Sequence, residues 1–256
     1  MSSRITVESH GPVSVITLND PDRMNALTLE LLAELDDAMG RFVVDDDSLV
    51  AVVTGAGGKA FSAGADLESL IPELAVRGLD VLITDPRERF FSRVEKPIIA
   101  AVEGFCLAGG LEVMLGTDIR VAAESATFGL PEVRWGLVPA AGSHVRLPRQ
   151  IPYAVAMQML LTGKSIPAHR AYELGLVNEV VADGGALDRA LELATAISSN
   201  GPMAIRTAKR IAVEALGLEP AFELEARHAD AVFRSDDARE GPAAFVERRR
   251  PEFTGR

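Results

Sequence analysis

The residues best suited to chemistry in this chain are two glutamates in apolar, glycine-containing segments. Glu112 lies within segment 104–116, GFCLAGGLEVMLG, and Glu132 lies within segment 128–133, FGLPEV. A carboxylate among apolar neighbours is costly to ionise, so its pKa rises when it is desolvated. Proteins keep such groups mainly where a proton must be transferred. The two glutamates therefore indicate general acid–base chemistry on a carbon atom or on water.

Each glutamate also has an ordinary structural interpretation. Glu112 would fall in the first turn of a helix, where a carboxylate complements the helix dipole. Its position between Leu111 and Val113 argues against such an exposed role. Glu132, taken alone, fits a surface turn in which it pairs with Arg134, and this interpretation is slightly favoured.

Two turns of small residues would allow a ligand to approach backbone amides closely. Segment 59–67, KAFSAGADL, contains the small residues 63–65 and then Asp66, for which a helix N-cap is the favoured interpretation. Gly109 and Gly110 would open a helix directly after a strand, which gathers free N–H donors and the positive end of the helix dipole. Tight packing of strand against helix explains these two glycines equally well.

The elements that must position these turns alternate between strands and helices. Segments 49–54 and 97–102 are apolar throughout, as expected for strands buried on both faces of a sheet. Segment 72–90, with scattered charges and prolines, is expected to be a mobile surface segment. Patterning predicts strands at 13–18, 49–54, 97–102, 119–123 and 126–128, and helices at 28–42, 153–162, 168–174, 186–198, 202–216 and 221–233.

Composition argues against several classes of function. The 256 residues carry a formal net charge of −11, so the composition lacks the excess of basic charge that favours binding to nucleic acid. Cys106 is the only cysteine and the four histidines lack zinc-type spacing, so neither an internal disulfide nor a metal site is expected. Segment 97–116 is long and mostly apolar, but its two glutamates count against a membrane span. The N-terminus lacks the pattern of a secretory signal, so we expect a cytoplasmic protein.

Taken together, these turns resemble the crotonase (enoyl-CoA hydratase/isomerase) superfamily over essentially the whole chain. The resemblance implies an α/β fold, a crotonase-type spiral of ββα units with a C-terminal helical trimerisation region. We expect residues 1–195 to form the core with the active site, and residues 196–256 to form the helical region of a homotrimer or a dimer of trimers. The matching segments are 25–27, 61–67, 96–104, 109–112, 118–122, 128–133, 136–139, 171–178 and 240–251.

The resemblance also implies how an acyl-CoA thioester would bind. In this superfamily two backbone N–H groups polarise the thioester carbonyl, and the match gives these roles to the amides of Ala63 and Gly109. Phe245 and Arg248 match residues that approach the adenine. The residues expected along the substrate are Ala63, Gly64, Ala65, Asp66, Gly109 and Met24.

Hydratases of the superfamily carry two glutamates, and Glu112 and Glu132 match their positions. The implied reaction is syn addition of water across the 2,3 double bond of a trans-2-enoyl-CoA, which gives a 3-hydroxyacyl-CoA. Glu112 would activate the water that attacks C3 and Glu132 would deliver a proton to C2, although both could hold the same water. No cofactor is expected, because coenzyme A is part of the substrate.

Other members of the superfamily remain alternatives, namely a dehydratase of an unusual hydroxyacyl-CoA, an isomerase, or a non-catalytic acyl-CoA-binding paralogue. Dienoyl-CoA isomerases add an acidic residue where this chain has Ala140 and Ala141, and Δ3,Δ2-enoyl-CoA isomerases commonly lack the first glutamate. Both observations favour a hydratase.

The chain departs from the common pattern at two places. Ala108 stands where a third glycine is frequent, and Ser143–His144 replace a glycine–threonine run. A packing or capping role is the favoured interpretation of His144, and a substrate contact is the alternative. Preference for acyl chain length is the property that these changes put in question.

Overall fold

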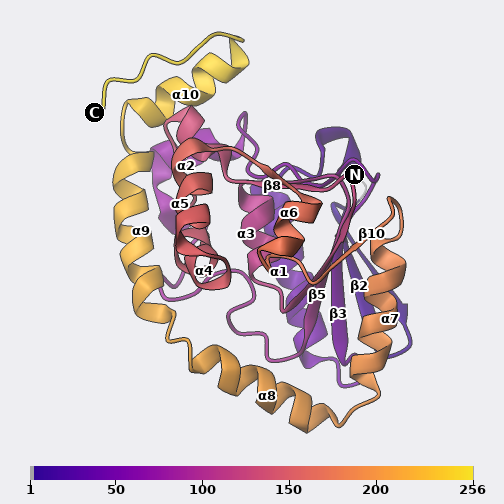
Figure 1. The fold of residues 1–256 in the computed structure, drawn as a ribbon. Helices are drawn as coiled ribbons and strands as arrows, with labels where there is room; N and C mark the ends of the chain where they lie inside the picture. The colour runs from indigo at the N-terminus through magenta and orange to yellow at the C-terminus, as the bar shows by residue number, and fades with distance from the viewer. Residues whose placement is uncertain (1–2, 256) are drawn as a thin grey trace.

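The computed structural model describes residues 3–255, in which a six-stranded sheet forms the centre of the molecule (Figure 1). Its first two strands form an antiparallel hairpin, and the remaining neighbours are parallel, with Val52 opposite Ile99 and Ala101 opposite Val121. The spatial order is β1 (Ile5–His10), β2 (Val13–Leu18), β3 (Val50–Gly55), β5 (Ile98–Val102), β7 (Ile119–Ala123) and β10 (Glu179–Val181).

A second sheet of four short strands lies beside the first. It contains β4 (Ala60–Ser62), β6 (Phe105–Leu107), β8 (Thr127–Gly129) and β9 (Ile166–Pro167) in that order. The chain alternates between the sheets, because β3, β5 and β7 are each followed by a strand of the smaller sheet. Each pair then leads into a helical turn: α2 (Leu70–Arg77), α3 (Gly109–Leu115) or η3 (Pro131–Trp135). This is the spiral of ββα units that the resemblance implies.

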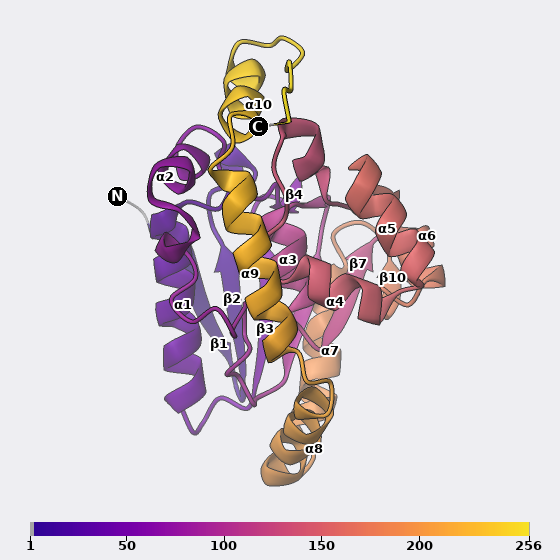
Figure 2. The same ribbon diagram turned by 90° about the vertical axis from the view of Figure 1, so that its left-hand side faces the viewer.

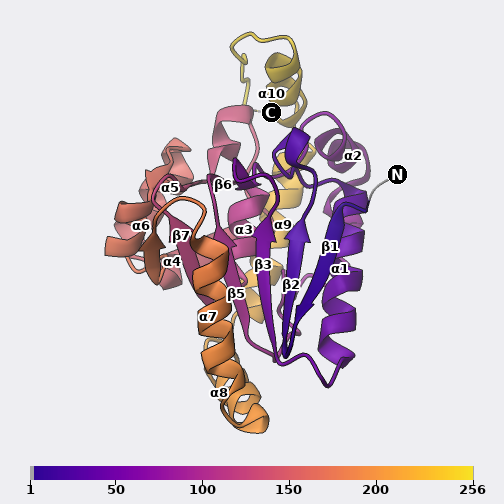
Figure 3. The ribbon, with the colours of Figure 1, turned by 90° about the vertical axis from the view of Figure 1, so that its right-hand side faces the viewer.

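The inner strands β2, β3, β5 and β7 of the large sheet are buried on both faces, as the apolar sequences of β3 and β5 predict. Alternate side chains point to opposite faces of a strand, so Val52 and Val53 enter different clusters. One face packs against α7 (Ala186–Ser198) through three alanines spaced four apart, Ala186, Ala190 and Ala194. Figure 3 shows α7 lying across this face, with α1 (Leu29–Val44) on the far side of the sheet.

The remaining helices follow η3 in the chain, and among them α6 packs against β8 and β9 of the smaller sheet. Figure 2 shows α9 running along the molecule between α1 and α4, while α8 projects from its lower end. No residue of α8 is buried. These helices are α4 (Ser143–Gln150), α5 (Tyr153–Thr162), α6 (Ala168–Glu173), α8 (Pro202–Glu214), α9 (Glu219–Phe233) and α10 (Asp237–Val246), with short 3-10 turns η1 (Pro21–Arg23) and η2 (Leu79–Val81).

Segment 97–116 contains β5, β6 and the whole of α3, in agreement with the preference for a buried strand–turn–helix. Among residues 3–255, no helix has both the length and the apolar character needed to cross a membrane. Cys106 is fully buried in β6, with its Sγ 3.8 Å from Met114 Sδ. This burial raises the pKa of the thiol far above its usual range.

Candidate active site

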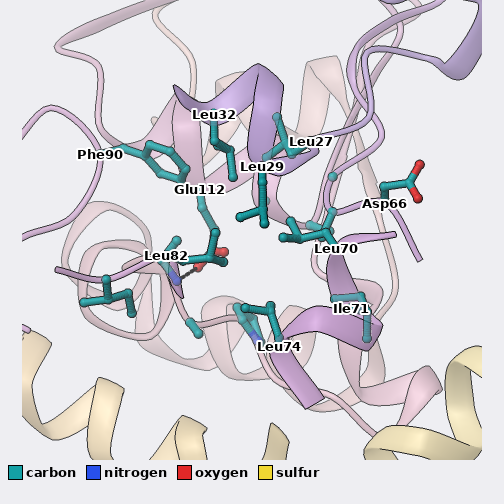
Figure 4. Close-up of a pocket in the computed structure, with 18 of the residues that line it drawn as sticks. Leu27, Leu29, Leu32, Asp66, Leu70, Ile71, Leu74, Leu82, Phe90 and Glu112 are labelled. Atoms are coloured by element: carbon teal, nitrogen blue, oxygen red, sulfur yellow. Dashed lines mark hydrogen bonds between the residues drawn. The ribbon is translucent and has the colours of Figure 1, made fainter. Parts of the chain in front are cut away.

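A largely apolar cavity of about 950 Å³ lies between α1, α2 and the turns that the sequence singled out. Figure 4 shows its walls, with Leu32 from α1, Leu70 and Leu74 from α2, and Phe90 from the segment before β5. The Glu112 carboxylate points into this space. Segment 72–90 is therefore not a surface segment throughout, because its leucines form part of a cavity wall.

Glu112 is held by one of its two carboxylate oxygens. Oε1 accepts hydrogen bonds from the Ala141 N–H at 2.8 Å, the Ser143 hydroxyl at 2.9 Å and the Ser143 N–H at 3.2 Å. Oε2 accepts none from residues 3–255. Burial, and then the nearby Glu225 carboxylate, raise the pKa of Glu112 to about 7, although the Ser143 hydrogen bonds oppose the rise.

Glu132 lines the same cavity from η3, directly after Pro131. Its Oε2 is buried and has no hydrogen-bond partner within the described part of the chain. Burial, together with the charge of Glu112, raises the pKa of Glu132 well above its ordinary value. The surface-turn interpretation is therefore wrong, and Arg134 instead lies with its Nε 3.5 Å from the Thr162 carbonyl oxygen. An unpartnered buried carboxyl oxygen is costly and is typical of a site that receives a ligand or water.

The backbone amide expected from Ala63 is not available to a ligand. The Ala63 N–H donates to the Met24 carbonyl oxygen at 3.0 Å, so the expectation for this residue needs correction. The next amide, that of Gly64, donates to Ser62 Oγ at 3.1 Å. The Ala65 N–H has no acceptor among residues 3–255, although its neighbour Asp66 donates to the Leu27 carbonyl oxygen at 2.9 Å. Ala65 is thus the residue of this turn that presents a free donor.

The amide of Gly109 lies beside this donor. Gly109 opens α3, and its N–H likewise has no acceptor within residues 3–255. A Cβ added to Gly109 would lie only 3.6 Å from the Ala65 nitrogen and 2.8 Å from Leu27 Cδ1. The two turns therefore meet backbone to backbone, and only glycine fits there without displacing a neighbour. Two unpartnered N–H groups so close together can both donate to one carbonyl oxygen.

A buried asparagine holds the first turn in place. Asn25 is fully buried, and its Nδ2 donates to the carbonyl oxygens of Ala60 at 2.8 Å and Ala56 at 3.0 Å. Ser62 Oγ in turn donates to the Asn25 carbonyl oxygen at 2.8 Å. Asn25 and Met24 both adopt φ of 53°, a left-handed conformation that asparagine tolerates better than most residues.

The second turn contains backbone strain at the position where glycine is frequent in the superfamily. Ala108 adopts φ 51° and ψ −129°, a combination that residues with a side chain rarely adopt. Its N–H donates to the Gly129 carbonyl oxygen at 2.9 Å, which ties the turn to β8. This strained residue places Gly109 at the start of α3.

Only some of the other residues expected near the substrate line the cavity. Met24 and Phe245 line the cavity, whereas Arg248 is not among its lining residues. Asp66 also lines it, but its Oδ1 accepts from Ser69 N at 2.8 Å and from Ser69 Oγ at 2.9 Å, so it caps the turn leading into α2. Among residues 3–255, no three metal-ligating side chains come together.

His144 does not line the cavity, and its backbone and side chain instead contact Glu225 on α9. The His144 N–H donates to Glu225 Oε1 at 3.1 Å, and Nδ1 lies 3.6 Å from the same oxygen. These contacts agree with the packing or capping interpretation. Sequence reasoning gave no role to Ser143, Ala141 or Glu225, because nothing in their local sequence indicates contact with a distant glutamate.

The fold and this site define a crotonase-type protein, and comparison with known proteins identifies the family. A family model described as enoyl-CoA hydratase/isomerase matches residues 8–256. The chain is 44% identical to an enoyl-CoA hydratase of Mycobacterium tuberculosis, over 98% of this chain and 96% of that protein.

Two solved structures are similar along the whole of both chains. EchA1_1 from Mycobacterium paratuberculosis is 39% identical with a TM-score of 0.89, covering 100% of each chain. A carnitinyl-CoA dehydratase from Mycobacterium avium is 39% identical with a TM-score of 0.88, again covering 100% of each. The chain belongs to the enoyl-CoA hydratase/isomerase family, within the crotonase superfamily.

Proposed function

We propose that this protein is an enoyl-CoA hydratase, which adds water across the 2,3 double bond of a trans-2-enoyl-CoA to give a 3-hydroxyacyl-CoA. One observation carries the proposal. Two buried carboxylates with raised pKa values, Glu112 and Glu132, line the same cavity as the unpartnered amides of Ala65 and Gly109. Such a site can polarise a thioester carbonyl and move protons at the adjacent carbons.

In this mechanism, the thioester oxygen accepts hydrogen bonds from Ala65 and Gly109, which stabilise the negative charge that develops on it. The free Oε2 of Glu112 removes a proton from water as the water oxygen attacks C3, and Glu132 delivers its proton to C2. Transfer of one proton between the two carboxyl groups then restores the starting state. Because the charges interact, the two glutamates titrate as a coupled pair.

The apolar part of the cavity offers space for an acyl group longer than a few carbons. Its lining follows α1 from Leu29 to Met39, and the ten residue steps between them span about 15 Å along a helix. We infer that the acyl chain extends along this wall, while coenzyme A leaves past Met24 and Asp66.

Dehydration of a hydroxyacyl-CoA is the second candidate. The similarity to a carnitinyl-CoA dehydratase favours it, since hydration and dehydration require the same groups. A non-catalytic acyl-CoA-binding paralogue is disfavoured, because two desolvated carboxyl groups contribute nothing to binding alone.

A homo-oligomer, either a trimer or a dimer of trimers, is part of the proposal. The projecting helix α8 has no buried residue, yet it carries Met203 at 82% exposure and Ile211 at 62% exposure. Exposed apolar side chains on an otherwise unpacked helix support contact with another copy of the chain.

The test is an assay with trans-2-enoyl-CoA substrates of four to twelve carbons. The absorbance of the conjugated thioester should fall as product forms. In a separate reverse assay that starts from 3-hydroxyacyl-CoA, the same absorbance should rise. Absence of turnover in both directions with every chain length would rule out the hydratase assignment.

A further inference from the structure

A buried ion pair lies behind the Glu112 carboxylate and takes no part in the mechanism above. Glu225 of α9 accepts through Oε2 from Arg89 Nε at 2.9 Å, with the two side chains only 2% and 1% exposed. Arg89 also donates to the Phe222 carbonyl oxygen at 2.8 Å and to the Pro86 carbonyl oxygen at 3.0 Å. A pair so deeply buried is expensive to desolvate, which makes its position informative.

The other oxygen of Glu225 leads directly to the residues that hold Glu112. Glu225 Oε1 accepts from the His144 N–H at 3.1 Å. The preceding residue, Ser143, donates its N–H and its hydroxyl to Glu112 Oε1 at 3.2 and 2.9 Å. Consecutive residues at the start of α4 are therefore held by different carboxylates, one structural and one proposed to be catalytic.

Packing reinforces this connection. A Cβ added to Gly142 would lie 3.1 Å from Arg89 Cγ and 3.4 Å from Phe222 Cε1, so the turn before α4 is in close contact with both residues. Arg89 and Arg146 lie over the Phe222 ring, at 5.2 and 5.3 Å from its centre. The turn that supplies the donors to Glu112 is thus fixed between α9 and the segment that carries Arg89.

We propose that Glu225 is a positioning residue for Glu112, and that the packing of α9 onto α4 completes the geometry of the active site. Glu225 fixes the His144 N–H, and through it the Ser143 groups that orient Glu112 Oε1. The expected effect of Glu225 on turnover rests on the proposed hydratase function.

The charge of Glu225 also acts on Glu112. The charged groups facing Glu112 are Glu132 from η3, Glu225 from α9, and His144 and Arg146 from α4. Burial is the largest cause of the raised pKa of Glu112, and the negative charge of Glu225 is the second largest. Burial lowers the pKa of His144, but the hydrogen bond and charge of Glu225, together with Glu112 and the Pro139 carbonyl, outweigh this and raise the pKa.

Two variants separate the geometric role from the electrostatic one. Glu225→Gln keeps an acceptor for His144 but removes a negative charge, so the pKa of Glu112 should fall. The acid limb of kcat/KM should then move to lower pH by about one pH unit, with kcat nearly unchanged at high pH. Glu225→Ala removes the acceptor as well, and kcat should fall about tenfold to a hundredfold with little change in KM. Glu223→Gln, on the exposed side of α9, is the matched control.

A double variant covers the case in which Glu225→Gln fails to fold because Arg89 is left without its partner. Arg89→Gln/Glu225→Gln removes both charges, and it should move the acid limb in the same direction but less far. Carboxyl ¹³C NMR of glutamate-labelled protein reports the pKa of Glu112 without turnover, with Glu112→Gln assigning its signal.

The outcomes distinguish the two proposals. An unchanged pKa of Glu112 in Glu225→Gln, with unchanged kcat in Glu225→Ala, overturns the positioning role even when the protein is an active hydratase. A lowered pKa of Glu112 in a protein inactive on every enoyl-CoA supports the link to α9 and rejects only the hydratase assignment.

Discussion

At the scale of single residues, the site assigns different tasks to chemically identical groups. The backbone and hydroxyl donors hold only Oε1 of Glu112, so Oε2 remains available for chemistry. Glu132 has a buried oxygen that no donor within residues 3–255 satisfies. Position in the fold, and not residue type, therefore separates an anchored carboxylate from one that lacks a partner.

Removing either carboxylate should abolish most turnover while leaving binding intact. We expect Glu112→Gln and Glu132→Gln each to lower kcat by about 10²–10⁴, because each removes a group that transfers a proton. The dissociation constant of a saturated acyl-CoA, measured by calorimetry, should change little. Glu68→Gln at the exposed rim of the cavity is the control. Near wild-type rates in both active-site variants would refute the assigned roles.

Stability should depend on pH through Glu112. Burial raises its pKa from 4.5 to about 7, so below pH 4.5 both folded and unfolded states are protonated and its contribution is fully present. As pH rises from 4.5 to 7, the unfolded state loses the proton first. The free energy of unfolding should therefore fall, by about 3 kcal/mol in total.

Urea unfolding of wild type and Glu112→Gln at pH 5 and pH 8 measures this effect. The difference in stability between pH 5 and pH 8 should be smaller in the variant. Glu132→Gln, measured in parallel, reports how far the two carboxyl groups titrate together. Equal pH dependence in wild type and Glu112→Gln would show that Glu112 has no raised pKa.

At the scale of elements, strong periodicity predicted the long helices and the buried strands. Helix 186–198 matches α7 in both bounds, and strand 97–102 matches β5 to within one residue. Three-residue strands such as β4 and β6 were missed, because so short a run shows no period. Helix α4 was missed as well, since Pro148 interrupts its pattern.

The same reasoning explains which parts of the site could be predicted. Glu112 and Glu132 were singled out because carboxylates are unusual among apolar neighbours, and Gly109 because it would open a helix directly after a strand; the resemblance supplied its role as a donor. The sequence could not show that the free amide belongs to Ala65 and not to Ala63. Only the folded backbone shows that the Ala63 N–H already donates to the Met24 carbonyl oxygen. Glu225 lies 113 residues from Glu112 in the sequence, so no local pattern links them.

The walls contributed by α1 and α2 should control acyl chain length. Leu32→Trp places a larger side chain in the cavity, so kcat/KM for a ten-carbon enoyl-CoA should fall about tenfold more than that for a four-carbon one. Leu161→Trp, at a side chain that is 69% exposed on α5, should leave the ratio unchanged. An equal loss for both substrates would show that the chain does not extend along α1.

At the scale of the whole molecule, the projecting α8 makes association testable. We expect sedimentation velocity to show a trimer or a dimer of trimers at micromolar concentration. Ile211→Glu places a charge among the exposed apolar residues of α8 and should shift the protein toward monomer. Val44→Glu, at the 77% exposed end of α1, is the control. A stable wild-type monomer would contradict the proposed assembly.

The burial of Cys106 has a practical consequence for studying that assembly. The only thiol of the chain lies on β6, fully buried beside Met114 of α3, and its burial keeps it protonated and therefore unreactive. We therefore expect the wild-type protein not to react with maleimide labels. A cysteine introduced at Met203 would be the single reactive thiol, so one spin label or fluorophore per protomer could report the spacing between copies of α8 in solution.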